Sequence, residues 1–435
     1  MSRLMRRLAV AAVLVSALAI PAAASPATPS SSSGTTASCQ LQVSSWWTGG
    51  GEAAGLTKLI NIWNANHKTC PFKNETVAGG AGSNAKAVLA QRLAAKNPPD
   101  SFQGHAGKEL LDYIKAGQVL PIDSIYKENG FDKVMPKSLL SQITYKGHLY
   151  SVPVNIHRAN VLWYNPKVLR QAGITKAPVT WAQFVADLKR IEAKLPNVTP
   201  LALGEEWTQK HLLETILIST LGPKGWNALW TKGGNWNSAK VSTAIARFDD
   251  LLQNYTNSDA ASLTWQDAGK LVIDGKAAFN IMGDWQDGYF SGTTKGGNLA
   301  KKPGVAYKWT AVPGTTGVYD WLSDSFTLPK GAPHPAAAKQ WLAFLGSSKA
   351  QDTFNPVKGS IPARQDANPK LYGPYLKWAL TQWKTDTLVG SLTHGVVASN
   401  AWNASIDTAI GLFTQTHDKG AFQKALAAAH DKNAV

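Results

Sequence analysis

The chain has 435 residues, enough for two or three domains, and 44% hydrophobic with 17% charged residues, as in a globular protein. Its formal net charge of +16 raises nucleic acids and anionic membranes as partners. The 44 Lys and Arg form no block of five or six, so we attribute the charge to solvation and expect no nucleic-acid partner. The 17 tryptophans are unusual and suggest binding surfaces as well as cores.

The N-terminus has the pattern of an export signal. Three arginines within the first seven residues precede a short apolar run and three alanines at 22–24. The run is too short to span a bilayer well. We predict a cleaved signal peptide at 1–24, a Ser/Thr/Pro/Ala-rich linker at 25–38 and a periplasmic protein.

Two cysteines, Cys39 and Cys70, each precede a run with β-propensity, at 41–47 and 72–78. Export favours a disulfide between them, which would join the starts of neighbouring strands. The alternative is two free thiols.

The stretch from Trp46 to Glu52 (Trp-Trp-Thr-Gly-Gly-Gly-Glu) organises the first half of the chain. A strand ends in two tryptophans, three glycines turn the backbone, and a helix begins with Glu52 in its first turn. Indole faces beside orientable polar groups can hold a small polar ring. The alternative is a tight turn with two core tryptophans.

Strands and helices alternate through the next segment. Ser83 is predicted to cap a helix that ends at 97–99, and a strand at 101–103 leads into a helix that stops at Gly117. A hairpin at 145–154 follows. This βαβα order is typical of a parallel sheet covered by helices.

A second alternating series begins near residue 160. Its predicted elements are a strand at 161–164, a helix from Asn165, a capping box at Thr180 and Gln183, a strand at 200–203, a helix capped by Ser238 and a strand within 276–285. Late strands at 309–313 and 321–328 are expected to return to the first series. We therefore predict two α/β lobes, 39–155 with 306–360 and 156–305 with 361–435.

Polar and aromatic residues follow several predicted strands, where ligands of open α/β sheets bind. They are Trp47, Glu52, Gln103, His105 and Trp285, with Asp324, Lys358 and His394 in later loops. No known catalytic motif or cysteine cluster is present, and the nine histidines are scattered, so we expect neither a metal site nor a cofactor. Indole stacks on the apolar face of a pyranose, and carboxylates, amides and ammonium groups bond its hydroxyls.

The chain resembles extracellular solute-binding proteins of carbohydrate-importing ATP-binding-cassette systems, in particular periplasmic glucose-binding proteins. The matching stretches are 46–52 (WWTGGGE), 77–83 (VAGGAGS), 152–158 (VPVNIHR), 275–285 (GKAAFNIMGDW), 358–364 (KGSIPAR) and 394–395 (HG). They span nearly the whole predicted mature chain in order. The resemblance implies a type II periplasmic-binding clamp, a monomer that captures glucose or a similar hexose and passes it to membrane permease subunits.

The resemblance also implies roles for single residues. Trp47 would stack on the sugar, while Trp265 and Trp285 would face it from the opposite lobe. The groups expected to bond its hydroxyls are Glu52, Gln103, His105, Asp324, Lys358 and His394. Some relatives have lysine in place of His105 and asparagine near Leu322, so one hydroxyl contact is expected to differ.

Several alternatives remain open at this point. Trp265 could be a core residue and His394 a loop histidine with its own partner, and we interpret His157 and Arg158 as hinge or packing residues. The ligand could be an oligosaccharide or a solute that is not a sugar. Glu52 and Asp324 could instead be the paired acids of a glycoside hydrolase.

Overall fold

The computed structural model describes residues 39–79 and 82–434. The predicted signal peptide and linker lie outside the described residues. Residues 39–435 belong to one compact unit. Among the helices that the structure describes, none combines the length and apolarity that crossing a bilayer requires.

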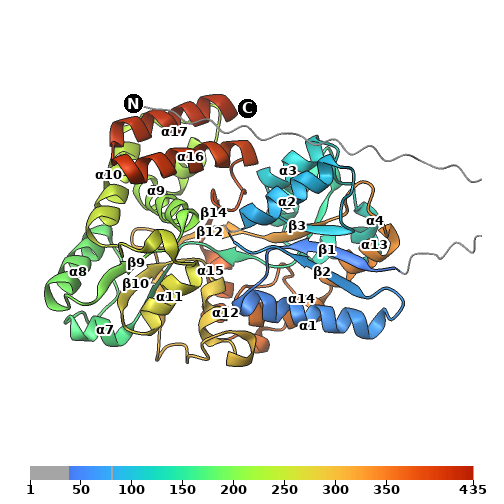
Figure 1. Cartoon of the computed structure of the whole chain (residues 1–435), viewed down its shortest axis with the longest axis horizontal. Helices are drawn as coiled ribbons and strands as arrows, with labels where there is room; N and C mark the ends of the chain where they lie inside the picture. Colours follow the sequence, from blue (N-terminus) through green and yellow to red (C-terminus); the bar gives the residue numbers. More distant parts are fainter. Residues whose placement is uncertain (1–38, 80–81, 435) are drawn as a thin grey trace, which may run out of the picture. The chain divides into compact units, whose positions relative to one another are not determined.

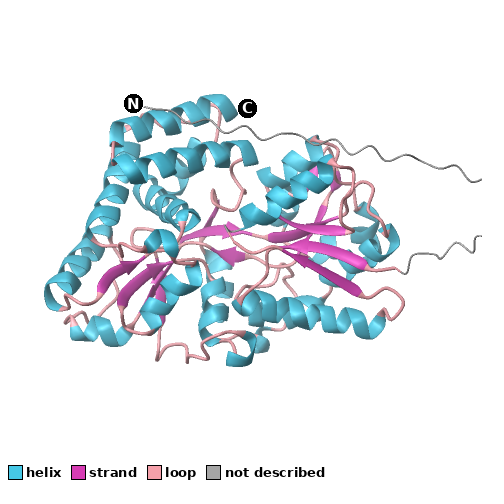
Figure 2. Cartoon of the chain, in the orientation of Figure 1, coloured by secondary structure: helices cyan, strands magenta, loops and turns pink. Residues whose placement is uncertain are grey.

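The first lobe is built on a five-stranded sheet in the order β2-β1-β3-β13-β6. Figure 1 labels β1, β2 and β3 of this sheet, and Figure 2 shows the helices and strands in the same view. Strands β1, β2 and β3 run parallel, and β13 is antiparallel to β3 and β6. The strands are β1 (Leu41–Ser45), β2 (Phe72–Thr76), β3 (Ser101–His105), β6 (Ser151–Pro153) and β13 (Asp324–Thr327). Its helices are α1 (Gly50–Asn66), α2 (Ser83–Ala94), α3 (Lys108–Lys115), α4 (Asp123–Asn129), α5 (Phe131–Val134), α6 (Lys137–Gln142), α13 (Pro335–Leu345) and α14 (Ser348–Lys358).

Helix α1 confirms the helix predicted after the glycine turn, with Glu52 in its first turn. Its buried face carries Leu56, Leu59 and Trp63 and packs against α14. A Cβ on Gly55 would lie 2.7 Å from the Phe354 ring, so glycine permits this close helix contact.

The second lobe contains a four-stranded sheet in the order β11-β8-β10-β9. Its strands are β8 (Val161–Tyr164), β9 (Thr199–Ala202), β10 (Ala277–Ile281) and β11 (Lys308–Ala311). The helices around it are α7 (Pro166–Gln171), α8 (Trp181–Lys194), α9 (Glu206–Leu229), α10 (Ala239–Asn254), α11 (Trp265–Ile273), α12 (Trp285–Ser291), α16 (Asn400–Thr416) and α17 (Lys419–Asn433). Figure 1 shows α16 and α17 side by side, and they pack on each other and on α9 and α10.

One predicted segment is placed differently. The late strand expected at 309–313 to return to the first lobe is β11, which pairs antiparallel with β8 throughout its length. Only part of the range 306–360 therefore belongs to the first lobe, because β11 belongs to the second. Local propensity predicts the strand, but its partner is decided by tertiary packing.

A third sheet, β14-β12-β7, lies where the chain passes between the lobes. It consists of β7 (His157–Arg158), β12 (Val318–Leu322) and β14 (Thr387–Gly390), with α15 (Pro374–Thr385) beside it. The strand predicted at 321–328 is divided at Ser323 into the end of β12 and the whole of β13. Its return to the first series is confirmed for β13, which pairs with β3 and β6. The buried Arg158 supports this junction: its Nη2 donates to the Val318 carbonyl at 2.9 Å, and its guanidinium lies over the Trp378 ring.

The local turn and cap predictions have mixed outcomes. The hairpin of β4 (Thr144–Tyr145) and β5 (His148–Leu149) turns at 146–147 with positive φ at both residues. The capping box of Thr180 and Gln183 and the Ser238 cap are confirmed. Ser83 is not a cap: Gly82 precedes α2 with φ of 94°, and Ser83 is its first residue.

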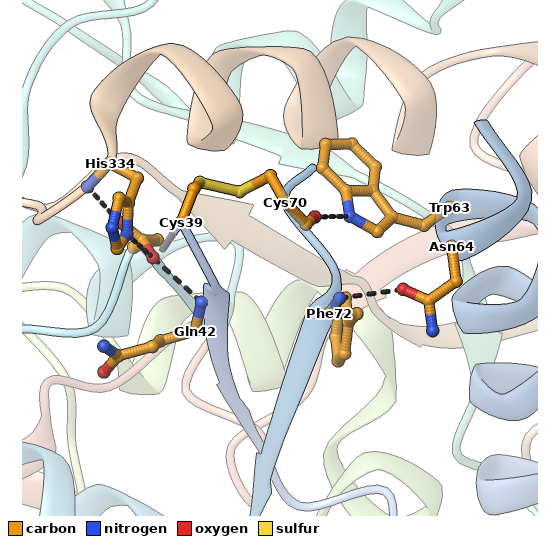
Figure 3. The surroundings of a disulfide bond; sticks show 8 residues. Cys39, Gln42, Trp63, Asn64, Cys70, Phe72 and His334 are labelled. Carbon is orange, nitrogen blue, oxygen red and sulfur yellow. Dashed lines mark hydrogen bonds and ion pairs between the residues drawn. A yellow bond between two sulfur atoms is a disulfide. The ribbon is translucent and has the colours of Figure 1, made fainter. Parts of the chain in front are cut away.

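The structure confirms the disulfide between Cys39 and Cys70, which joins the starts of the paired strands β1 and β2 (Figure 3). The Trp63 indole N–H donates to the Cys70 carbonyl at 2.9 Å, and the Phe72 N–H donates to Asn64 Oδ1 at 2.8 Å. The disulfide joins β1 to the edge strand β2, and the two hydrogen bonds tie this edge of the first sheet to helix α1.

The replacement of both cysteines by serine should lower the free energy of unfolding by about 3–4 kcal/mol, because the disulfide closes a chain segment with a sequence separation of 31. Urea unfolding followed by tryptophan fluorescence measures this difference. Dithiothreitol should destabilise the wild type by a similar amount and leave the double variant unchanged. Equal stability of the oxidised wild type and the variant would contradict the stabilising role.

Candidate functional site

A cavity of about 220 Å³ is lined by residues of both lobes and of the third sheet. The first lobe contributes loops after β1 and β2, the end of β3 and the end of α14. The second lobe contributes the segments that begin α9, α11 and α12 and the loop after β14. The cavity thus lies at the carboxyl ends of β1, β2 and β3 and of the parallel pair β9 and β10, as predicted.

Most of the predicted site residues line this cavity. Those that do are Glu52, His105, Trp265, Trp285, Asp324, Lys358 and His394. The structure therefore brings together side chains that are far apart in the sequence: Glu52 and His394 are 342 positions apart (394 − 52).

Trp47 and Gln103 do not line the cavity. Trp47 is buried in the core of the first lobe, with its ring 4.5 Å from that of Phe354, and its neighbour Trp46 faces the cavity instead. Gln103 lies behind two residues that line the cavity. Its Nε2 donates to Asp324 Oδ1 at 2.9 Å, and its Oε1 accepts the Trp46 N–H at 3.2 Å. Gln103 therefore positions two lining residues.

Trp46 provides the indole ring with which the first lobe lines the cavity. A Cβ on Gly82 would lie 2.7 Å from the Trp46 ring, and Gly82 has φ of 94°, so a larger residue would be strained there and would displace the indole. The Lys86 ammonium lies 5.5 Å from the ring centroid and His105 5.0 Å away. The ring is therefore held from several sides.

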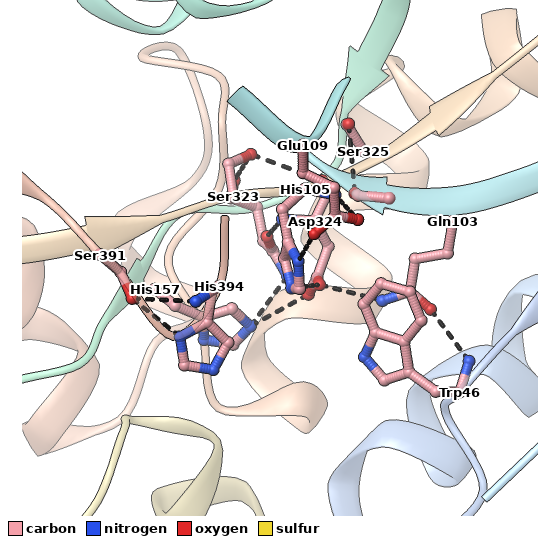
Figure 4. A network of polar contacts seen from close by, with 12 residues as sticks. Trp46, Gln103, His105, Glu109, His157, Ser323, Asp324, Ser325, Ser391 and His394 are labelled. Atoms are coloured by element: carbon pink, nitrogen blue, oxygen red, sulfur yellow. Dashed lines mark hydrogen bonds and ion pairs between the residues drawn. The ribbon is translucent and has the colours of Figure 1, made fainter. Parts of the chain in front are cut away.

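Asp324 is the central polar group of the cavity (Figure 4). Its Oδ1 accepts the bond from Gln103, and its Oδ2 accepts one from Asn155 Nδ2 at 2.7 Å. His157 Nε2 lies 3.2 Å from Oδ2. Burial by itself would raise the pKa of Asp324, but His157, Lys358 and His105 outweigh burial and hold the pKa well below its usual value. The carboxylate is therefore ionised.

His105 has one ring nitrogen engaged by the protein. Its Nδ1 lies 2.9 Å from Glu109 Oε2, and Glu109 Oε1 accepts the His105 backbone N–H at 3.2 Å. Lys86 Nζ also donates to Glu109 Oε2, at 2.7 Å. Burial opposes ionisation of Glu109, yet Lys86 and His105 lower its pKa to about 2. The ionised Glu109 orients the ring, while Nε2 remains 3.7 Å from Asp324 Oδ1.

Lys358 and Glu52 form an ion pair at the cavity wall, with Nζ donating to Oε1 at 2.7 Å. Lys358 ends α14, and its Nζ also lies 5.6 Å from the centroid of the Trp285 ring in the second lobe. The ammonium therefore contacts an acid of one lobe and an indole of the other.

The second lobe supplies an aromatic wall. The Trp285 ring lies 6.2 Å from Trp207, 6.5 Å from Trp265 and 5.2 Å from His394. Burial lowers the pKa of His394 well below its usual value, and the charges of His105, His211 and His157 add to this, so its imidazole is neutral. Its Nδ1 lies 2.9 Å from Ser391 Oγ.

Sequence reasoning missed several lining residues, chiefly Trp46, Thr48, His157, Glu205, Trp207 and Gln266. Trp46 has a signal in the strand pattern, because Leu41, Val43 and Trp47 share one parity and Trp46 has the other. Glu205 and Trp207 directly follow a strand that was predicted, so the strand-end rule applies to them too. His157 was interpreted as a hinge residue, and the structure places it both in the hinge sheet and at the cavity.

This arrangement can bind a small neutral polar molecule. Charged groups of both signs are buried and paired, so an ionic ligand is not needed to neutralise the site. Carboxylate oxygens accept hydroxyl protons, while the ammonium and imidazole groups can donate. Indole rings provide apolar faces next to these groups.

Comparison with known proteins gives the family. Residues 48–352 match the bacterial extracellular solute-binding protein model. The chain is 36% identical over 422 residues to an uncharacterized ABC transporter extracellular-binding protein of Pyrococcus horikoshii, with 95% of this chain and 93% of that protein covered. It is also 30% identical over 384 residues to a xylose/arabinose-binding protein of Haloferax volcanii, with 88% of this chain and 82% of that protein covered.

Among solved structures, the bacterial solute receptor AcbH, which has an exclusive preference for β-D-galactopyranose, superposes with a TM-score of 0.77 at 19% identity. The match covers 91% of this chain and 98% of that chain, and it confirms the predicted two-lobed clamp. The chain belongs to the bacterial extracellular solute-binding proteins.

Proposed function

We propose that this protein captures a monosaccharide, with glucose as the first candidate and galactose as the second, and delivers it to an ABC permease. The observation that carries this proposal is the small cavity in which Trp46 and Trp285 accompany polar groups that are held by protein partners, among them the ionised Asp324. It binds by noncovalent contacts and requires neither a metal nor a cofactor.

The size of the cavity supports a single sugar ring. Its volume of about 220 Å³ lies below the roughly 300–1,000 Å³ of pockets that hold drug-sized ligands. The xylose/arabinose-binding relative also carries the name of a monosaccharide receptor. Glucose itself is favoured by the motif resemblance rather than by the volume.

The polar groups suit a polyhydroxylated ring. Asp324 and Glu52 are acceptors, Lys358 is a donor, and His105 and His394 each have a further ring nitrogen at the cavity. Each of these charged or imidazole groups already has a protein partner, which fixes its orientation. An epimer with one hydroxyl inverted would leave a buried polar group unpaired, which is the basis of strong discrimination.

Transport follows from the two-lobed construction. The binding residues come from both lobes, so the full set of contacts is complete only when the lobes are close together. We propose that the closed, loaded form docks on the permease, and that the protein is exported and monomeric. We place the first lobe at 39–155 and 324–360, which assigns β11 to the second lobe and leaves β12 in the sheet between the lobes.

A short oligosaccharide is the second candidate. A groove of about 830 Å³ between α2, α9 and α16 shares Glu205 and Trp207 with the cavity. A second sugar unit could extend into this groove, whereas the cavity itself would hold the first.

The replacement Trp46→Ala should weaken glucose binding roughly 5- to 150-fold, if stacking of the apolar C–H face of the sugar on indole contributes about 1–3 kcal/mol, as aromatic stacking on nucleobases does. Trp47→Phe is the matched control: it alters the adjacent tryptophan, whose ring packs on Phe354 in the core, and should keep affinity within a few fold. Titration calorimetry with glucose, galactose, mannose, xylose and maltose measures both effects.

The same titrations decide between the candidates. Tight maltose binding with weak glucose binding would favour the oligosaccharide receptor. Failure of every sugar to bind would contradict the proposed ligand class. Loss of binding in Trp47→Phe but not in Trp46→Ala would show that the wrong indole has been assigned.

The two carboxylates make a poor hydrolytic pair. A glycosidase needs one acid with a raised pKa to protonate the leaving group, whereas the pKa of Asp324 is lowered and Glu52 is paired with Lys358. We therefore expect no release of nitrophenol from nitrophenyl glucosides and galactosides above the buffer blank, with a commercial glycosidase as positive control. Turnover that disappears in Asp324→Asn would contradict the receptor function.

A further inference from the structure

We propose that His157 is a positioning residue for sugar binding, and that its imidazolium form joins Asp324 of β13 to Asp284 of the second lobe to create the binding-competent site. This inference rests on the proposed function, and it adds a specific residue and a pH dependence to that function.

The position of His157 is unusual for a packing residue. It is fully buried in β7, in the sheet between the lobes, and it also lines the cavity (Figure 4). Its Nε2 lies 3.2 Å from Asp324 Oδ2, while its Nδ1 forms a short contact with Asp284 Oδ1. The ring therefore bridges two buried carboxylates.

Both carboxylates are coupled to the ligand site. Asp324 lines the cavity directly. Asp284 is the residue before α12, and the next residue is Trp285, the indole at the centre of the aromatic wall. Asp284 Oδ2 also accepts the Arg158 backbone N–H at 3.0 Å. By holding both acids, the His157 ring thus fixes the Asp324 carboxylate and the Trp285 indole relative to each other.

The charge state of the ring decides which partners it has. An imidazolium donates from both nitrogens and can satisfy both acids. A neutral ring that keeps its Nδ1–H on Asp284 has an unprotonated Nε2, which would face Asp324 Oδ2 with no proton between them. It could instead accept from Asn155 Nδ2, which lies 3.0 Å away. The Asn155 amide is oriented by its Oδ1, which accepts the Asp324 N–H at 2.8 Å.

The surroundings favour the protonated ring. Burial and the nearby Lys358 charge oppose it, but Asp284 and Asp324 prevail and raise the pKa of His157. Burial also raises the pKa of Asp284, although the charge and hydrogen bond of His157, the Arg158 N–H and Lys358 counteract this. We assign the shared proton to the ring because the ring lies between two acids, Asp284 and Asp324, and Asp284 Oδ2 already accepts the Arg158 N–H.

The other titratable groups are His105 and His394 near Asp324 and the ring, and Asp287, Tyr319 and Tyr375 near Asp284. Burial raises the pKa of Asp287 to about 7, so Asp287 also titrates in the neutral range, and only the pH dependence that His157→Gln removes is assigned to His157.

Loss of the proton at higher pH should therefore weaken sugar binding. The His157 ring is protonated at pH values below its raised pKa and neutral at pH values above it. The affinity for the sugar should therefore be highest at the acid end of the pH range. Above the pKa of the sugar-free protein, each pH unit should weaken binding by up to about tenfold, because binding must then take up a proton.

Titration calorimetry of glucose from pH 6 to pH 9, in two buffers of different ionisation enthalpy, measures affinity and proton uptake together. Wild type should bind more weakly as pH rises and take up protons at the alkaline end. His157→Gln should bind at least tenfold more weakly at pH 6, because both N–H groups of an amide are on one nitrogen and cannot replace donors at two separate ring positions. This part of the pH dependence should also be lost.

His417→Gln is the matched control. His417 also pairs with an aspartate, with Nδ1 2.8 Å from Asp249 Oδ1, but it follows α16 and does not line the cavity. It should behave as wild type at every pH. Thermal melts of both variants show whether folding is retained, and imidazole NMR of the sugar-free wild type reports the charge of His157 directly.

Two results would overturn this inference while leaving the proposed function intact. One is glucose binding with the same affinity and pH profile in wild type and His157→Gln, and the other is a His157 ring that is neutral at pH 6. If wild type binds no sugar at any pH, the proposed function itself fails, and this inference fails with it.

Discussion

The site depends on one buried carboxylate at the place where the chain changes sheets. Asp324 follows Ser323, the residue at which β12 of the third sheet gives way to β13 of the first. An ionised carboxylate without partners would be very costly to bury. Gln103 and Asn155 donate to it from β3 and from the segment after β6, and His157 approaches it from β7. The register of several strands is therefore a condition for an ionised carboxylate at the cavity.

Local sequence patterns predict much of this fold. The glycine turn into α1, the capping box at Thr180 and the disulfide are all properties of short segments or of composition. Strand partners are not local properties, which is why the sheet to which β11 belongs was predicted wrongly. The break at Ser323 has the same origin: 321–328 is a run with β-propensity, and only packing of two sheets divides it.

The prediction of the site came mainly from the positions of strand ends and from the family resemblance. The errors in that prediction have a physical cause. Adjacent residues of a strand point to opposite faces, so a shift of one position exchanges a core residue for a lining residue. Trp47 and Trp46 are such a pair. Gln103 belongs to β3, which is buried along its whole length, so no polar alternation marks which side chain reaches the cavity and which supports a neighbour.

The polar groups that face the cavity are held by partners that the sequence alone cannot pair with them. Lys358 and Glu52 are 306 positions apart, and Asp324 and Gln103 are 221 apart. Each contact fixes a side chain that would otherwise lose rotational freedom when a sugar binds, so part of that entropic cost is met during folding. The same contacts leave some lone pairs and N–H groups facing the cavity. A ligand that enters the cavity therefore meets polar groups whose orientation is fixed before it arrives, so its own hydroxyl geometry decides how many of them it can bond.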